Sequence, residues 1–163
     1  MIVDANVFKG FYQVDIGKTH SLCGCPAKLM GVVTPIRPVY HDDGGVLEHE
    51  WGAVVDRDWF EAWYSASLVS GVVKFCDAQK NMQVEKQIQG KGFPGGRDST
   101  YIRVALQVVS IEKSCTFYTE DLDFYNPKLK GCSAIRRKKT LKSGAGPVSK
   151  ILAKHHITVS CVP

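Results

Sequence analysis

Two apolar runs of the chain lead into an aspartate, and this pattern constrains the fold more than any other feature of the sequence. Asp4 follows Met1-Ile2-Val3, and Asp121 comes just after the run at residues 115–119. A short apolar run that ends in an acid is typical of a buried strand that delivers a carboxylate to the edge of a sheet. In open α/β sheets, ligands bind at that edge. We therefore expect Asp4 and Asp121 to lie at a ligand-binding edge.

Strand and helix patterns alternate along the chain, which predicts an α/β fold with a mostly parallel central sheet covered by helices. The length of 163 residues fits one domain spanning residues 1–163, without an internal repeat or linker. The expected strands are 1–4, 36–40, 72–76, 115–119 and 157–162. The expected helices are 6–12, 26–33, 46–67 with a second helix starting near Asp56 or Asp58, 79–89, one from residue 98 and one from residue 147. Residues 127–146 are expected to form a basic loop.

Charge is distributed unevenly along the sequence. Residues 1–123 contain 12 Lys and Arg and all 16 acids, for a net charge of −4, whereas residues 124–163 contain 9 Lys and Arg and no acid, for +9. The densest basic cluster is Arg136, Arg137, Lys138 and Lys139, with Lys128, Lys130 and Lys142 around it. A basic segment beside acidic positions suggests a polyanionic partner. The alternative is a solvated basic loop that keeps the protein soluble.

Three more acids complete a candidate metal-binding set, and each of the five also has a structural explanation. The set is Asp4, Glu50, Asp98, Asp121 and Asp123. Carboxylates that gather from distant positions repel one another unless a cation neutralises them. Taken singly, Asp4 or Asp98 could cap a helix, Glu50 could be a solvated helix residue, and Asp121 or Asp123 could form a turn. As an ordered set, they favour a metal site.

The order of these acids resembles the motifs of PIN-domain nucleases over nearly the whole chain. Residues 2–8 (Ile-Val-Asp-Ala-Asn-Val-Phe) resemble the first motif of that family, and residues 119–124 (Thr-Glu-Asp-Leu-Asp-Phe) resemble its Thr-x-Asp-x-Asp-Phe motif. Between them, residues 42–45 followed by Glu50 resemble the segment with the helical glutamate, and Asp98 resembles the third acidic position. Trp51 replaces a more typical tyrosine, and the basic segment at 127–146 has no counterpart in the family pattern.

The resemblance implies a three-layer α/β/α sandwich and an endoribonuclease that depends on Mg²⁺ or Mn²⁺. Carried over by position, Asp4, Glu50, Asp98 and Asp121 are metal ligands, and Asp123 is a fifth catalytic acid that orients a water molecule or acts as a base. Asn6 and Thr119 match supporting polar positions. The RNA backbone would be held by the basic cluster at Arg136, Arg137, Lys138 and Lys139. The resemblance further implies one of three roles: a toxin restrained by an inhibitory protein partner, an enzyme of RNA processing, or a phage-defence nuclease. A homodimer is also plausible for a member of this family.

Other residue types favour structural roles. Cys23 and Cys25 lack the spacing of common zinc motifs, so we expect reduced thiols rather than structural zinc. His155 and His156 precede the last strand and are expected to be structural. We find no signal peptide and no apolar run of 18 residues, which predicts a cytoplasmic protein without a membrane span.

Two other function classes compete with the nuclease. A non-catalytic PIN-like module that binds protein or RNA would typically lose one or two of the acids, and here all are present. A phosphoacceptor signalling domain would have paired acids after the first strand, where this chain has only Asp4. The nuclease is therefore the preferred hypothesis.

Overall fold

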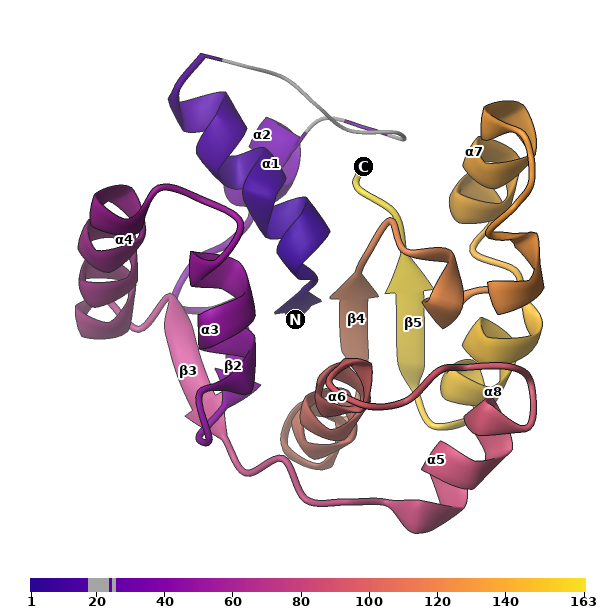
Figure 1. Cartoon of the computed structure of the whole chain (residues 1–163). Helices are drawn as coiled ribbons and strands as arrows, with labels where there is room; N and C mark the ends of the chain where they lie inside the picture. The colour runs from indigo at the N-terminus through magenta and orange to yellow at the C-terminus, as the bar shows by residue number, and fades with distance from the viewer. Residues whose placement is uncertain (18–23, 25) are drawn as a thin grey trace.

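Five short strands and eight α-helices form the part of the chain that the structure describes, which is residues 1–17, 24 and 26–163 of a computed structural model (Figure 1). The strands are β1 (Ile2–Val3), β2 (Val39–Asp42), β3 (Val73–Cys76), β4 (Cys115–Tyr118) and β5 (Ile157–Ser160). The helices are α1 (Ala5–Asp15), α2 (Pro26–Met30), α3 (Val46–Gly52), α4 (Arg57–Val69), α5 (Met82–Gln89), α6 (Asp98–Glu112), α7 (Ala134–Ser143) and α8 (Pro147–Lys154). Two 3₁₀ helices, η1 (Leu122–Phe124) and η2 (Pro127–Leu129), follow β4.

The strands pair in parallel and form two small sheets, of order β1-β4-β5 and β2-β3. Val3 lies opposite Tyr118 in the first sheet, so the residues that follow them leave the sheet side by side. The amide of Tyr40 donates a hydrogen bond to the carbonyl of Met1 at 2.9 Å, which places β2 next to β1. These pairings confirm the α/β class and the parallel strands.

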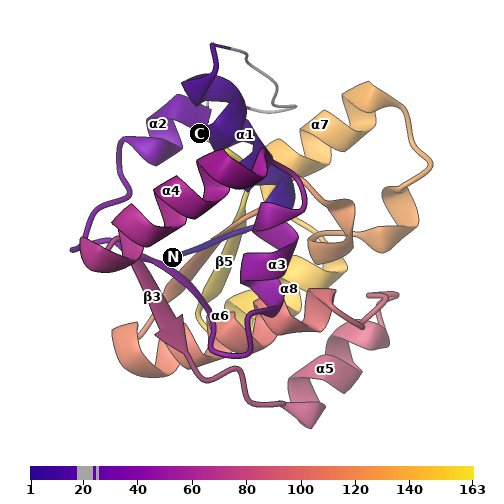
Figure 2. The same cartoon turned by 60° about the vertical axis from the view of Figure 1, so that its left-hand side comes forward.

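Aromatic side chains pack the helices against one another and against the first sheet. Phe8 of α1 stacks on Trp51 of α3, with ring centroids 5.2 Å apart, and contacts the edge of Trp63 of α4 at 4.9 Å. Figure 2 shows these three helices side by side. Tyr101 of α6 stacks on Phe117 of β4 at 5.4 Å. Burial of such side chains is the main favourable term in folding, and here it fixes α1, α3 and α6 around the end of β1.

The helical segment predicted for residues 46–67 is divided into two helices, as the sequence suggested. The carboxylate of Asp56 accepts a hydrogen bond from the amide of Trp59 at 3.0 Å and caps α4. An acceptor at this position satisfies a backbone N–H that has no partner within the helix. The expected extra strand at 72–76 is present as β3.

The basic loop predicted for residues 127–146 is wrong, because this segment contains η2 and the ten-residue helix α7. Ala, Arg, Lys and Leu are good helix formers, and they make up most of α7. The helix ends at Gly144, which has a φ of 64° that favours glycine. Leu141 is its buried anchor.

Other expectations concern the membrane and the thiols. Within the described ranges, no helix is both long and apolar enough to cross a bilayer. Among the described residues, Cys76, Cys115, Cys132 and Cys161 are free thiols. Cys23 and Cys25 lie outside the described residues.

Candidate functional site

Thr119 connects the ends of β1 and β4, and with them two of the predicted acids. Its hydroxyl group donates a hydrogen bond to Oδ2 of Asp4 at 2.5 Å, and the Oγ1 atom of Thr119 accepts one from the backbone amide of Asp121 at 3.0 Å. Thr119 is fully buried and Asp4 is 5% exposed. The parallel pairing of β1 with β4 explains this contact, because Asp4 and Thr119 directly follow the paired residues Val3 and Tyr118. The structure thus brings Asp4, Thr119 and Asp121 together, as the sequence predicted.

Asp4 also caps α1, so the same side chain has a structural role in the helix and belongs to the candidate site. Its Oδ1 accepts from the backbone amide of Asn6 at 3.5 Å. The side chain of Asn6 lies on the exposed first turn of α1. Asn6 therefore contacts the acidic residues through its backbone, rather than through the amide side chain that the sequence singled out.

Asp121 caps η1, which follows β4 after a short connection, and Asp123 is the second residue of η1. Oδ1 of Asp121 accepts from the amide of Asp123 at 2.9 Å. This is the local turn expected of an aspartate at such a position. Asp123 is 3% exposed although it lies in a single 3₁₀ turn. The turn directs one partly exposed and one buried carboxylate into the same region.

Glu50 is placed by its neighbour Trp51 and linked to the other acids through Tyr101. The indole nitrogen of the fully buried Trp51 donates to the carbonyl of Val3 at 2.9 Å, so α3 is fixed at the residue before Asp4. The hydroxyl of Tyr101 accepts from the amide of Ala5 at 3.2 Å. Burial, then the charges of Asp4 and Glu50, and a hydrogen bond with Glu50 raise the pKa of Tyr101. Tyr101 is a site residue that the sequence analysis did not identify.

Asp98 is the first residue of α6 and is not its cap. Arg97 occupies the cap position without a side-chain hydrogen bond to the helix. The structural alternative for Asp98, a helix cap, is therefore not realised. A negative charge in the first turn still interacts favourably with the helix dipole.

Burial and the charges of neighbouring acids raise the pKa of two members of the set, Asp4 and Asp98. Burial, opposed by the hydrogen bond from Thr119 and reinforced by the charges of Asp121 and Asp98, raises the pKa of Asp4 to about 7. Burial and the charges of Asp121, Asp123 and Glu50 raise the pKa of Asp98 to about 6. Both carboxyl groups would ionise more readily if positive charge were added nearby.

One lysine already supplies positive charge to this region. The ammonium group of Lys130 contacts Oδ2 of Asp123 directly and lies 4.0 Å from Oδ1 of Asp121. The hydrogen bond to Asp123 is the largest cause of the raised pKa of Lys130, and the charges of Asp121 and Asp98 add to it. The sequence analysis placed Lys130 only in the basic segment, because its partners are not evident from spacing alone.

The four basic residues singled out in the sequence lie on α7, near the end of the molecule toward which β4 and β5 point (Figure 1). Arg136, Lys138 and Lys139 are exposed. Arg137 differs, because it is half-buried and its Nε is buried without a hydrogen-bond partner in the part of the chain that the structure describes. Three of the four side chains are therefore free to meet a ligand from solvent.

The chemical nature of the five acidic side chains supports a metal site, whereas their arrangement does not form a complete ligand set. Within residues 1–17, 24 and 26–163, no group of three or more His, Cys, Asp or Glu side chains is arranged to hold a metal ion. The donors nevertheless fit a hard divalent cation, since they are all carboxylates and their charges repel one another. Asp4, Glu50, Asp98 and Asp121 are the residues that could hold such an ion.

Comparisons with known proteins add no identity to this geometry. No family model, no curated protein and no solved structure matches the chain.

Proposed function

We propose that this chain is an endoribonuclease that uses Mg²⁺ or Mn²⁺ to hydrolyse RNA phosphodiester bonds. The observation that carries the proposal is the hydrogen-bonded connection of Asp4, Thr119 and Asp121 across the ends of two parallel strands. The resemblance of the motifs to PIN-domain nucleases supports it. As part of the same proposal, the two sheets act as one central sheet of a three-layer α/β/α sandwich.

Each acid has a role that follows from its surroundings. Asp4 and Asp121 would hold the cation, and Thr119 connects the side chain of Asp4 with the backbone amide of Asp121. Glu50 and Asp98 complete the ligand set from α3 and α6. A bound divalent cation would neutralise charge at phosphorus and activate a water molecule for attack. Asp123 would orient that water, because its carboxylate belongs to the same turn as Asp121.

The buried residue Tyr101 supports the acidic residues from the interior of the protein. It accepts a hydrogen bond from the backbone amide of Ala5 at the start of α1, and the charge of Glu50 contributes to its raised pKa. Its ring is held by stacking on Phe117. A rigid support of this kind keeps ligands oriented, which is what metal sites require of the groups behind their ligands.

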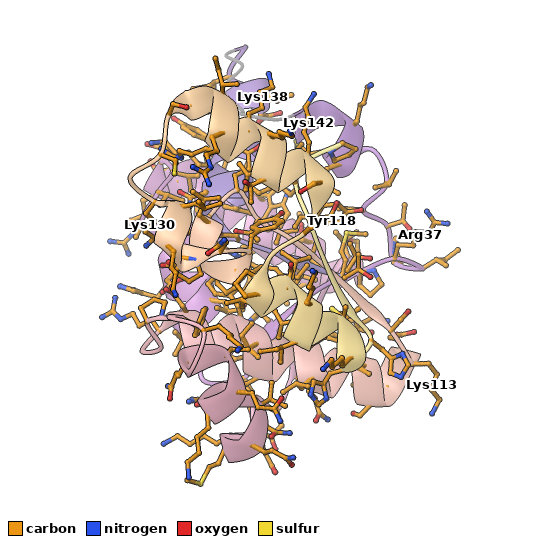
Figure 3. All side chains as sticks on the ribbon, turned by 90° about the vertical axis from the view of Figure 1, so that its right-hand side faces the viewer. Arg37, Lys113, Tyr118, Lys130, Lys138 and Lys142 are labelled. Carbon is orange, nitrogen blue, oxygen red and sulfur yellow. The ribbon has the colours of Figure 1, made fainter. Side chains whose placement is uncertain are left out.

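The helix α7 provides a surface for the RNA backbone. Arg136, Lys138 and Lys139 are exposed on it, and Lys142 follows one turn after Lys138. Figure 3 shows Lys138 and Lys142 on this helix. Contacts between such cations and phosphates position a nucleic acid without selecting its sequence.

A chelator experiment tests the proposed activity. A 5′-labelled single-stranded RNA incubated with the purified chain and Mn²⁺ is expected to be cut, excess EDTA should stop cleavage, and added Mn²⁺ should restore it. Cleavage that survives the chelator would contradict the metal-dependent mechanism. RNA binding without cleavage in either metal would instead favour the non-catalytic module.

The role of α7 gives a quantitative prediction. Changing Arg136, Lys138 and Lys139 together to Gln should weaken binding of single-stranded RNA by about 10–100-fold at low salt. The slope of log affinity against log salt should become shallower by about 2, because each lost phosphate contact contributes roughly 0.7. Fluorescence anisotropy over a series of salt concentrations measures both quantities.

A matched control changes the same charge elsewhere. Lys74, Lys80 and Lys86 are exposed residues of β3, the segment after it and α5. Their triple change to Gln should leave most of the affinity and the salt slope intact. Equal losses in the two triple variants would show that net charge, rather than α7, determines binding.

A further inference from the structure

A recess of about 220 Å³ lies between the start of α3 and the segment that leads into α6. The residues that line it are Gly44, Gly45, Val46, His49 and Arg97. His49 directly precedes Glu50 in α3, and Glu50 belongs to the acidic set. Arg97 directly precedes Asp98, a second member of that set, at the start of α6. Since consecutive Cα atoms are about 3.8 Å apart, the recess lies beside the acidic residues.

The guanidinium group of Arg97 is not engaged by any other described residue. Arg97 is exposed, and within the described ranges its side chain has no hydrogen bond or ion pair, not even with the adjacent Asp98. Arg57 and Arg103, by contrast, are each paired with a glutamate. The positive charge of Arg97 is therefore available to a ligand.

The backbone positions both walls of the recess. Gly95 and Gly96 turn the chain directly before Arg97, and their φ values of 79° and 69° lie in the left-handed region that favours glycine. On the other wall, Trp51 anchors α3 by a hydrogen bond to the end of β1. The side chains of His49 and Arg97 are thus exposed, but they project from segments that the fold holds in place.

The chemistry of the lining fits a phosphate group. A guanidinium group can bind a phosphate through two parallel N–H···O bonds, and an imidazole ring has an N–H to donate in either protonation state. The first amides of α3, at Val46 and Leu47, already donate to the carboxylate of Asp42 at 2.8 Å. Anion contacts would therefore come from the side chains of Arg97 and His49. None of the described lining residues is Phe, Tyr or Trp, the usual platforms for a stacked nucleobase.

The recess and the basic helix α7 lie on different sides of the strand end that leads to the acids. Figure 1 shows α3 and α7 on opposite sides of β4, the strand that precedes Asp121. Glu50 and Asp98 come from α3 and α6, the helices on the side of the recess. Because a nucleic acid strand is a row of regularly spaced phosphates, RNA that contacts α7 could place a further phosphate in the recess as it crosses the acids.

We propose that this recess is a phosphate-binding subsite, in which Arg97 and His49 bind a backbone phosphate of the RNA on the side of the acidic residues opposite to α7. The inference rests on the proposed function and adds a second contact for the same substrate. Arg97 is the principal contact because its charge is permanent, and His49 adds a hydrogen bond. Contacts at both places hold the strand across the acidic residues.

A local probe of the recess tests the proposal without a metal ion or an activity assay. Uridine 5′-monophosphate is added in increasing concentrations to the intact chain at constant pH and without divalent ions. NMR follows the ring C–H signals of His49, which are assigned by their loss in His49→Gln. The nucleotide should shift these signals until the site is saturated, and uridine should leave them unchanged. Arg97→Gln should weaken nucleotide binding by about 10-fold or more, because a charged hydrogen-bonding partner is lost.

Arg37→Gln is the matched control. Arg37 is also exposed, but it precedes the start of β2, whereas Gly44 of the recess follows the end of that strand. This variant should keep the nucleotide affinity within about twofold of the native value. In RNA binding, Arg97→Gln should also make the slope of log affinity against log salt shallower by roughly 0.7, and Arg37→Gln should not.

Three results would overturn the subsite: no response of the His49 signals to the nucleotide, an equal response to uridine, or native affinity in Arg97→Gln. Cleavage of RNA with Mn²⁺ by such a protein would leave the proposed nuclease intact. Conversely, nucleotide binding at His49 in a chain that cuts no RNA would overturn the nuclease and keep the subsite.

Discussion

Asp4→Asn should reduce the kcat of Mn²⁺-dependent RNA cleavage on the order of 10³-fold, the scale seen when an enzyme loses a principal electrostatic contact with its reacting centre. Asp4 is buried, accepts the hydrogen bond from Thr119 and is repelled by Asp121 and Asp98, two other members of the acidic set. An asparagine can keep the acceptor for the backbone amide of Asn6 but supplies no charge to a cation. Single-turnover cleavage of a labelled RNA at saturating Mn²⁺ measures the effect.

The control for this variant is an acid outside the site. Asp58 lies exposed in the first turn of α4, so Asp58→Asn alters the net charge by the same amount. We expect its cleavage rate to stay within about twofold of the native rate, because exposed positions away from the site have small effects. Native-like cleavage by Asp4→Asn would remove the basis of the proposed mechanism.

The stability of the metal-free protein should depend on pH through the same residue. Burial raises the pKa of Asp4 to about 7 from its ordinary value of 3.8. Between these values the folded protein binds the proton more tightly than the unfolded chain, so the contribution of Asp4 to stability decreases as the pH rises. At about 1.4 kcal/mol per pKa unit, the decrease between pH 4 and pH 7.5 is on the order of 3–4 kcal/mol. The more exposed Asp98, with a pKa raised to about 6, adds a smaller amount in the same direction.

Asp4→Asn isolates this contribution from the other titrating groups. Burial lowers the pKa of His41, which acts in the opposite direction because the unfolded chain then binds the proton more tightly. The groups that face Asp4 itself are Thr119, Asp121 and Asp98. Urea denaturation at several pH values, without divalent ions, should show Asp4→Asn gaining stability over the native chain as the pH rises. A stability difference between the two proteins that stays constant across pH 4–7.5 would contradict the raised pKa of Asp4. Added Mn²⁺ should stabilise the native protein relative to Asp4→Asn, because the ion is expected to bind the carboxylate and not the amide.

Much of the fold follows from local patterns in the sequence. Three apolar runs predicted β1, β4 and β5, and the parallel pairing of β1 with the central strand β4 brings Asp4 next to Thr119. The division between α3 and α4 at Asp56 was evident because aspartate is a strong helix cap. Each of these features depends mainly on residues that are close together in the sequence.

The features that sequence analysis missed depend on contacts between distant residues. α7 has one buried anchor, Leu141, so it lacks the apolar periodicity that identifies helices, although its composition has high helix propensity. Tyr101 looks like one more buried residue of α6, and only the folded chain shows that its hydroxyl accepts a hydrogen bond from Ala5 at the start of α1. Lys130 belongs to a basic segment by composition, and only the folded chain pairs it with Asp123.

The tryptophans give this protein an optical probe of its own. All three lie in α3 and α4, and the indole of Trp51 is bonded to the carbonyl that precedes Asp4 while its backbone follows Glu50. If an ion binds as proposed and shifts either carboxylate, we expect the change to reach a buried fluorophore stacked on Phe8. Intrinsic emission would then report binding in an unlabelled sample, in real time and without substrate.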